Sequence, residues 1–284
     1  MKYILLASLI CIITLSNAQS VGVRAGINLS KFSGPLEATE RYSFSNGFHF
    51  GINYGYKFTK KLMLRAEVVY SQAGTKQTFD GDSYYIIYKN DFTNLFEKGK
   101  STLNLNISNA YINVPLVLAY QLIPKIEIYG GFAANFLINP TANGTLRFES
   151  STRSQEITFR QSLGYNYYTD VSGGTSGSAF GSRPITIIVD GERTTIPKYA
   201  GAYYQDLEKS DSRFKIFDLT AVAGVNYFFN SGFYTGARLN YGLTDVTNQS
   251  VDRSWVNFND DGTAVYRNDR DINFDLEFSL GFRF

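Results

Sequence analysis

The sequence predicts an all-β fold, an eight-stranded antiparallel up-and-down transmembrane β-barrel. Three observations predict it: segments in which apolar and polar residues alternate, connections that are short and long in turn, and an aromatic content of 16% beside 25 Gly and 6 Pro. Successive side chains of a strand point to opposite faces, so strict alternation fits a sheet between lipid and a polar lumen. An even number of antiparallel strands can close into a ring, which removes the sheet edges that lipid cannot solvate.

Eight segments show this alternation, and each places its apolar residues on one face. They are residues 21–32, 48–58, 62–71, 112–120, 126–136, 217–227, 235–243 and 272–284. The last is the most regular, because every second residue from Ile272 to Phe284 is Ile, Leu or Phe, and the residues between are Asn, Asp, Glu, Ser, Gly and Arg. A face this apolar beside one this polar suits a lipid-facing sheet better than a sheet on a protein core.

The connections between the segments distinguish a barrel from a soluble β-sandwich, the alternative all-β fold. Tight turns are expected at 59–61, 121–125 and 230–232, and every other connection is long. A barrel inserted from the periplasm has short periplasmic turns and long extracellular loops, whereas a sandwich has no reason to put all its long connections at one end. Both mature termini are therefore expected in the periplasm.

The N-terminus predicts export. Lys2 precedes an apolar run over 4–15, and Ser16-Asn17-Ala18 is a small-x-small cleavage site, so residues 1–18 are interpreted as a signal peptide. The run is too short for a membrane helix of about 20 residues. The only cysteine, Cys11, would leave with it, so the mature chain, residues 19–284, is expected to hold neither a disulfide nor a Cys-ligated metal.

The inward face is predicted to be plugged with charged side chains. An eight-stranded barrel has an interior just wide enough for side chains to fill. Buried charges of mixed sign persist only when they are paired and hydrogen-bonded, so we predict a salt-bridged lumen. The predicted charge network consists of Arg24, Lys57, Arg65, Glu67, Glu127, Asp218, Arg238, Asp275, Glu277 and Arg283. The alternative is a narrow or gated channel for small solutes, which requires a water path between these charges.

The connection over residues 140–213 is predicted to be a long extracellular loop insertion and the place for a function. Its Ser, Thr, Gly and Tyr content is a composition that recognition loops use. The candidate contact residues are Tyr165, Tyr167, Tyr168, Tyr203 and Tyr204. Two alternatives stay open: the loop binds a protein or glycan partner, or it folds over the barrel mouth and shields it. Residues 185–189 are a candidate hairpin strand.

Catalytic, cofactor and metal sites are not expected. The only histidine, His49, is predicted in the lumen as a hydrogen-bonding residue, and no nucleophile and base show a catalytic spacing. Asn259-Asp260-Asp261-Gly262, with Asp252 and Asp269 nearby, lacks the spacing of a calcium loop and is interpreted as a solvated turn. A net charge of +2 gives no reason to expect a nucleic-acid partner.

Four strand segments carry more specific motifs. They are 65–74 (RAEVVYSQAG), 111–118 (YINVPLVL), 128–132 (IYGGF) and 238–246 (RLNYGLTDV). Together they resemble the Bacteroidetes outer-membrane β-barrel family often called the PorT family, and Gln19 after the cleavage site is typical of exported proteins in that phylum. The terminal Phe284 resembles the aromatic signal that the outer-membrane assembly machinery reads.

The resemblance implies a location in the outer membrane, with membrane lipid and the assembly machinery as partners. The family is named for a member needed for secretion of proteases and adhesins through the type IX pathway. We therefore expect a non-enzymatic integral outer-membrane protein that acts through its surface loops in binding or in envelope or secretion assembly.

Overall fold

The computed structural model describes residues 19–36, 38–90, 93–153, 155–206, 208–209, 211–249, 265 and 270–284. The expected signal peptide with Cys11, the turn Asn259-Asp260-Asp261-Gly262, and Asp252 and Asp269 lie outside the described residues. Among the described residues, no helix is long and apolar enough to cross a membrane.

The described elements are almost all strands. They are β1 (Gln19–Ser33), β2 (Arg41–Lys57), β3 (Leu62–Asn90), β4 (Thr93–Ile123), β5 (Ile126–Ser150), β6 (Thr158–Asn166), the 3₁₀ turns η1 (Ser172–Gly174) and η2 (Gly177–Ala179), β7 (Ile185–Val189), β8 (Glu192–Ile196), β9 (Tyr199–Ala200), β10 (Phe217–Phe228), β11 (Phe233–Gly242) and β12 (Ile272–Arg283).

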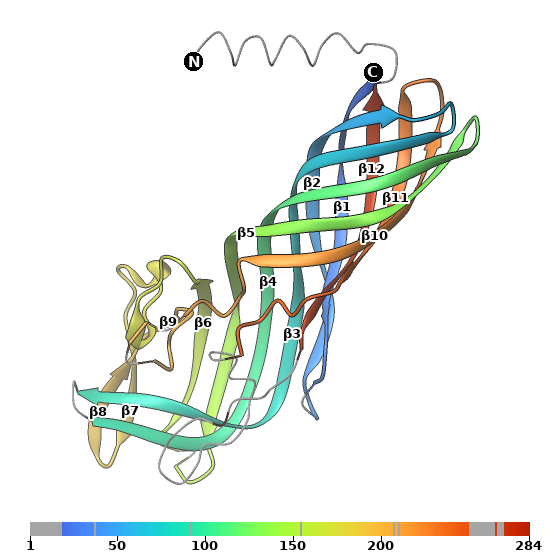
Figure 1. The fold of residues 1–284 in the computed structure, drawn as a ribbon. Helices are drawn as coiled ribbons and strands as arrows, with labels where there is room; N and C mark the ends of the chain where they lie inside the picture. Colours follow the sequence, from blue (N-terminus) through green and yellow to red (C-terminus); the bar gives the residue numbers. More distant parts are fainter. Residues whose placement is uncertain are drawn as a thin grey trace, which may run out of the picture.

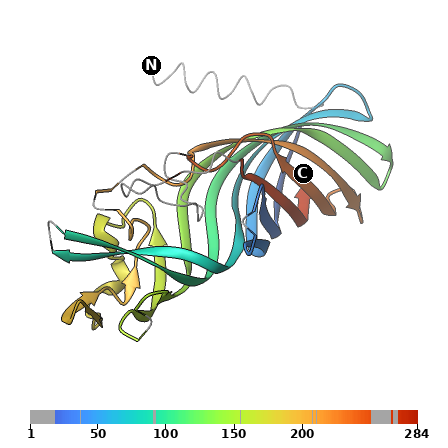
Figure 2. The ribbon, with the colours of Figure 1, turned by 90° about the horizontal axis from the view of Figure 1, so that it is seen from below.

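Eight of these strands form a closed antiparallel ring. The order runs β10–β11–β12–β1–β2–β3–β4–β5, and β5 pairs with β10 to close it. Figures 1 and 2 show the ring from two directions. The turns at 58–61, 124–125 and 229–232 lie at the end where the chain finishes, which we call the turn end, and the opposite end is the loop end. The predicted eight-stranded up-and-down barrel is confirmed.

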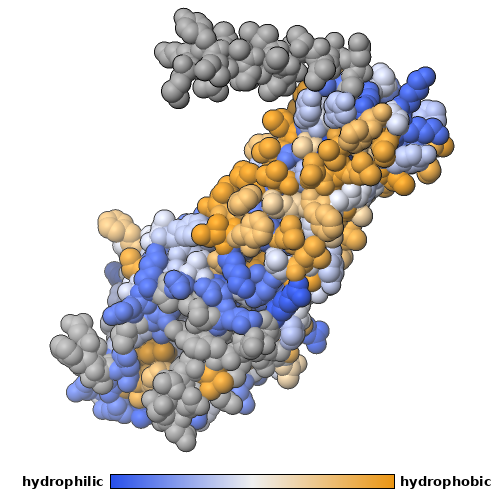
Figure 3. All heavy atoms as spheres, viewed as in Figure 1, coloured by the Kyte–Doolittle hydropathy of each residue, from blue (hydrophilic) through white to orange (hydrophobic). Residues whose placement is uncertain are grey.

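The two faces of the barrel differ in polarity as the alternation predicts. Side chains such as Ile27, Ile52, Leu116 and Phe132 are exposed on the outer face, while their chain neighbours point into the lumen and are mostly buried. Figure 3 shows the hydrophobic residues gathered over the barrel and hydrophilic ones over the part beyond its loop end. The outer face therefore fits the hydrocarbon region of a bilayer.

Three barrel strands continue far beyond the loop end. A transmembrane strand needs about 9–11 residues, whereas β3, β4 and β5 have 29, 31 and 25. Their outer parts pair with one another, β6 adds to β5, and β9 adds to β6 in parallel. We call residues 74–109 and 140–213 the loop-end extension. Residues 140–213 are thus not a loop alone, because their first part continues β5 and pairs with β6; the candidate strand at 185–189 is β7, paired with β8.

The extension has a hydrophobic core of its own on the face that continues from the lumen. In β3 the inward residues change from Arg65 and Glu67 in the barrel to Phe79, Tyr85 and Ile87 in the extension, all of them buried. Further buried residues of the same core come from β4, β5, β6 and the segment after β6. They include Leu103, Leu105, Leu146, Phe148, Phe159, Leu163, Ile187 and Ile196. The sheet therefore inverts its polarity where it leaves the membrane.

Candidate functional site: the lumen and the loop-end extension

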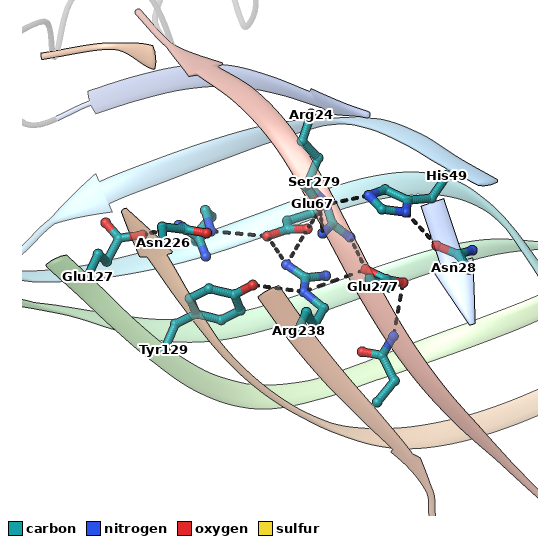
Figure 4. A network of polar contacts seen from close by, with 12 residues as sticks. Arg24, Asn28, His49, Glu67, Glu127, Tyr129, Asn226, Arg238, Glu277 and Ser279 are labelled. Carbon is teal, nitrogen blue, oxygen red and sulfur yellow. Dashed lines mark hydrogen bonds and ion pairs between the residues drawn. The ribbon is translucent and has the colours of Figure 1, made fainter. Parts of the chain in front are cut away.

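Glu67 on β3 pairs with three arginines in the lumen, and Figure 4 labels two of them, Arg24 and Arg238. Arg238 Nη2 lies 2.7 and 2.9 Å from its two carboxylate oxygens. Arg24 Nε lies 3.2 Å from Oε2, and Arg65 Nε lies 3.0 Å from Oε1. The Glu67 side chain is 1% exposed, so these ion pairs form in a site almost without water.

Two further glutamates, Glu277 and Glu127, form ion pairs with the same arginines. Glu277 pairs with Arg24 at 3.0 Å and accepts a hydrogen bond from Asn240 Nδ2 at 2.9 Å. Glu127 accepts from Arg65 at 2.6 Å, and its other oxygen accepts from Arg283 at 2.5 Å. Mixed charges held this closely satisfy the condition for burial, because each ion has partners of opposite sign.

Tyr129 on β5 joins the cationic part of the network. Its hydroxyl accepts from Arg238 Nε at 3.1 Å. The guanidinium carbons of Arg65 and Arg238 lie 4.5 and 5.1 Å from its ring centroid, within the range of cation–π attraction. The aromatic ring therefore fills the space between two arginines and stabilises both.

The structure brings together seven of the ten residues predicted for the lumenal network. They are Arg24, Arg65, Glu67, Glu127, Arg238, Glu277 and Arg283. Asp218 and Asp275 are buried in the lumen, but no ion pair within the described parts of the chain includes them. Lys57 is exposed at the last position of β2, so its placement in the lumen was wrong. It stands at the turn end, where the long side chain reaches water instead of the packed interior.

His49 on β2 is also part of the lumen, as predicted. Its Nδ1 lies 2.5 Å from Asn28 Oδ1 and its Nε2 lies 2.8 Å from Ser279 Oγ. Asn28 Nδ2 donates to the Gln72 carbonyl at 2.8 Å, so Asn28 Oδ1 is the atom that faces His49. His49 Nδ1–H therefore donates to Asn28 Oδ1, and His49 Nε2 accepts from the Ser279 hydroxyl. A serine bonded to a histidine in this way can act as a nucleophile. Here, however, His49 is 1% exposed, and a substrate would have to enter the filled lumen.

The tyrosines predicted as loop contacts are mostly in the core of the extension. Tyr165, Tyr167 and Tyr203 are buried, and Tyr204 packs against the core, with its ring stacked on Tyr165 at 6.0 Å. Only Tyr168 is exposed. The prediction of contact residues was therefore wrong for the buried three, because the apolar inward face of the sheet offers aromatic rings more burial than the surface does.

The two most exposed large apolar residues among the described residues of the extension were missed from the sequence. Val171 is 57% exposed, and Phe180, which directly follows η2, is 99% exposed. The signal was present in the sequence as a single Phe among small residues, Ser178-Ala179-Phe180-Gly181-Ser182, in a stretch without alternation. Gly181 has a φ of 75°, a conformation that glycine adopts without strain. Such residues are better placed for contacts than the buried tyrosines.

Comparison with known proteins agrees with the closed, polar-cored ring. Residues 17–248 match the family model described as outer membrane protein beta-barrel domain. The chain belongs to this family. It is thus an outer-membrane β-barrel protein, and its location is the outer membrane.

Solved structures of other outer-membrane barrels are similar at low identity. Ail, the attachment invasion locus protein of Yersinia pestis, is 11% identical with a TM-score of 0.35, over 94% of this chain and 99% of that chain. The outer membrane protease OmpT from Escherichia coli is 10% identical with a TM-score of 0.41, over 94% and 96%. No curated protein sequence matches the chain. At such identities and scores, neither structure says anything about the activity of this outer-membrane barrel.

The buried tyrosines make the extension sensitive to alkali. Burial raises the pKa of the Tyr85 hydroxyl, and the neighbouring Tyr204 raises it further. Burial and Tyr204 likewise raise the pKa of Tyr165. Tyrosines of the unfolded chain ionise near their ordinary pKa of about 10. The neutral buried hydroxyls therefore contribute their full stabilisation below that pH, and the contribution is lost as the pH rises above it. We expect protease cleavage within 74–109 or 140–213 to accelerate above about pH 10, together with tyrosinate absorbance; ionisation of all tyrosines near pH 10 without cleavage would contradict this.

Proposed function

We propose that this outer-membrane protein is non-enzymatic and acts through its loop-end extension, by binding a protein or glycan partner or by assisting envelope assembly. The observation that supports this most is the length of β3, β4 and β5, which carry a separately cored structure out of the membrane. The arginine–glutamate network packs the lumen, and one cavity beside it, among the described residues, measures about 10 Å³, about the space that one water molecule needs. A narrow or gated channel is therefore the weaker proposal.

The orientation follows from the way such barrels insert. Short turns lie on the periplasmic side and long connections outside the cell. We therefore assign the turn end, with Gln19 and Phe284, to the periplasm and the extension to the cell surface. Phe284 is 75% exposed, its backbone N–H donates to the Val21 carbonyl at 2.8 Å, and its ring packs edge-to-face on Phe282, an arrangement that leaves most of the terminal residue accessible to the assembly machinery. Export by the signal peptide 1–18 is consistent with this orientation.

The finer role rests on the sequence resemblance alone. The strand motifs at 65–74, 111–118, 128–132 and 238–246 are similar to those of the PorT family, which favours a part in secretion or envelope assembly. Tyr168, Val171 and Phe180 are the candidate contacts of the extension because their apolar surface is exposed. The Ser279–His49 pair is assigned a structural part in the lumen, because both residues are buried.

A variant that lacks residues 168–211, closed by a short Gly-Ser linker, tests the proposal. The deletion keeps β3–β6, so the barrel should still assemble, which is checked by the shift in its gel mobility on heating. Cells with this variant should show the same envelope defect as cells without the whole chain, because the partner surface is gone. In planar bilayers, neither the mature chain nor the variant should give conductance steps, since the arginine–glutamate network fills the lumen.

Three other results would overturn the proposal. Steady conductance from the mature chain would make it a channel, and steps from the deletion variant alone would make the extension a gate. Normal envelope behaviour of cells that carry the assembled deletion variant would remove the extension from the function.

A further inference from the structure

The segment that follows β6, residues 168–184, begins at the base of the loop-end extension, where the strands leave the barrel. Asn166, the last residue of β6, is the register partner of Thr141 on β5, and the Tyr167 N–H donates to the Pro140 carbonyl at 3.4 Å. Figure 1 shows this part of the chain, with η1 and η2, at the end of the extension opposite to the β7–β8 hairpin. We call residues 168–184 the basal segment.

The apolar outer surface of the barrel reaches nearly the same level on this side. Ile138 on β5 and Ile216, directly before β10, are both exposed, and the Leu137 N–H donates to the Ile216 carbonyl at 2.7 Å. Pro140, whose carbonyl accepts from Tyr167, follows Ile138 by only two residues. The basal segment therefore starts at the edge of the lipid-facing surface, whereas the far tip of the extension lies away from it.

The basal segment also lies outside the closed ring. Within the barrel, β5 pairs with β10 over residues 126–136, and beyond the barrel it pairs with β6 over residues 141–149. β9 adds to the other edge of β6, and the Gly201 N–H after β9 donates to the Gly174 carbonyl of η1 at 3.1 Å. The segment is therefore held beyond β6, to the side of the barrel strands, as Figures 1 and 2 both show. A bilayer around the barrel would lie beneath it.

Hydrogen bonds to the backbone hold the basal segment in place. One carboxylate oxygen of the buried Asp170 accepts from the backbone N–H groups of Asn166 at 2.8 Å and Ala202 at 2.9 Å. These bonds tie the start of the segment to the end of β6 and to the chain after β9. Phe180 directly follows η2, so a hydrogen-bonded turn carries its ring. The exposure of Phe180 is therefore set by the fold of the segment.

The exposed surface of the basal segment has the composition of a contact with a membrane interface. Phe180 and Val171 are 99% and 57% exposed, and the segment contains only two charged residues, Asp170 and Arg183. Asp170 is buried and Arg183 is exposed, so the surface offers apolar groups and a cation but no carboxylate. Aromatic rings at the headgroup level, with Arg beside them, are typical of chains at a membrane surface. Figure 3 shows hydrophobic residues on this side of the extension, separate from those over the barrel.

We propose that the basal segment rests on the bilayer beside β5 and β10 and inserts Phe180 and Val171 into the lipid. The leaflet is the one at the loop end, which is the outer leaflet in the orientation proposed above. Transfer of exposed apolar surface from water to lipid favours this contact, and Arg183 can pair with lipid phosphate groups. The inference rests on the proposed function only for the side of the membrane, and it needs no protein or glycan partner.

The test places a single tryptophan in the basal segment and measures its contact with lipid. Trp255, the only tryptophan of the chain, is replaced by Phe, and either Phe180→Trp or Ile188→Trp is added. Ile188 is the matched control, because it is also exposed but lies on β7 near Asp190, which pairs with Lys89 at the far end of β3. Each protein is refolded into phosphatidylcholine vesicles in which part of the lipid carries bromine on its acyl chains.

Brominated lipid should quench the emission of the Phe180→Trp protein, and this emission should lie at shorter wavelength than that of Ile188→Trp, because lipid shields the indole ring from water. The Ile188→Trp protein should show neither effect. Adding Val171→Asp to Phe180→Trp should weaken the quenching at least about twofold, because a charge in the segment opposes insertion, whereas adding Ile188→Asp should leave it unchanged. The heat-dependent shift in gel mobility checks that each barrel is folded.

Three results would overturn the inference. The first is unquenched, water-exposed emission of the Phe180→Trp protein in a folded barrel. The second is equal quenching of Phe180→Trp and Ile188→Trp, because the whole extension would then lie on the bilayer. The third is a shift to shorter wavelength that occurs without quenching and is lost on dilution in the vesicles, which would place Phe180 against a second copy of the chain. The envelope defect of the 168–211 deletion is measured separately, so the proposed function can stand when this inference fails.

Discussion

Replacement of Glu67 by Ala is expected to lower the free energy of unfolding by about 3–5 kcal/mol, the cost of breaking a buried ion pair. Arg24, Arg65 and Arg238 all point at this carboxylate, at 3.2, 3.0 and 2.7 Å. Without it, three arginines remain close together in a barrel too narrow to hydrate them. Glu277 and Glu127 cannot move inward to compensate, since each is already held by an arginine and by an asparagine.

The measurement is urea unfolding of the mature protein refolded in lipid vesicles, followed by far-ultraviolet circular dichroism. Lys57→Ala is the control, because this exposed residue at the end of β2 should change stability by no more than about 0.5 kcal/mol. Combining Glu67→Ala with Arg238→Met should recover part of the loss, since the second change removes one uncompensated charge. A loss below about 1 kcal/mol for Glu67→Ala would mean that water reaches the network and that the lumen is not plugged.

The barrel and its lumen could be predicted because both depend on a period of two. One residue that is certain to face lipid, such as Phe278, fixes the direction of Glu277 and every alternate residue of β12. The register therefore placed Arg24, Glu67 and Arg238 on the inner face without any knowledge of their partners. The alternation could not show which charged residues pair with each other, because Arg238 on β11, a partner of Glu67, lies 171 residues away in the chain.

The extension could not be predicted by the same rule, because the rule assumes that the apolar face is the outer one. At Phe79 and Asp80, β3 alternates with the polarity of its faces exchanged, because the inward Phe79 is buried and the outward Asp80 is exposed. An apolar inward face means a protein core, so the reversal marks the point where the sheet leaves the membrane. The alternation of β4 between Leu103 and Ile107 carried the same signal. The same error explains why the buried tyrosines were predicted as contact residues, because they would be exposed in a loop that had no hydrophobic core.

Phe148→Ala is expected to cost about 3–5 kcal/mol of stability, the typical loss for a buried Phe. Phe148 is 0% exposed on β5, and its ring lies 5.7 Å from Tyr85 and 5.6 Å from Phe159. The three rings join β3, β5 and β6, so the cavity left by the substitution opens at the centre of the extension core. The loss should be local, because the barrel is held separately by the closed strand ring and the lumenal ion pairs.

Limited proteolysis and gel mobility separate the two parts. In Phe148→Ala, protease should cut within residues 74–109 or 140–213 faster than in the parent, while the heat-dependent mobility shift of the barrel stays unchanged. Phe180→Ala removes the same side chain from a position that is 99% exposed and should leave both readouts unaltered. Both readouts can be followed in increasing urea. If the barrel lost its mobility shift at the same urea concentration at which the extension became cleavable, the barrel and the extension would form one cooperative unit. The extension core would then belong to the stability of the membrane barrel itself, transmitted along the continuous strands β3, β4 and β5.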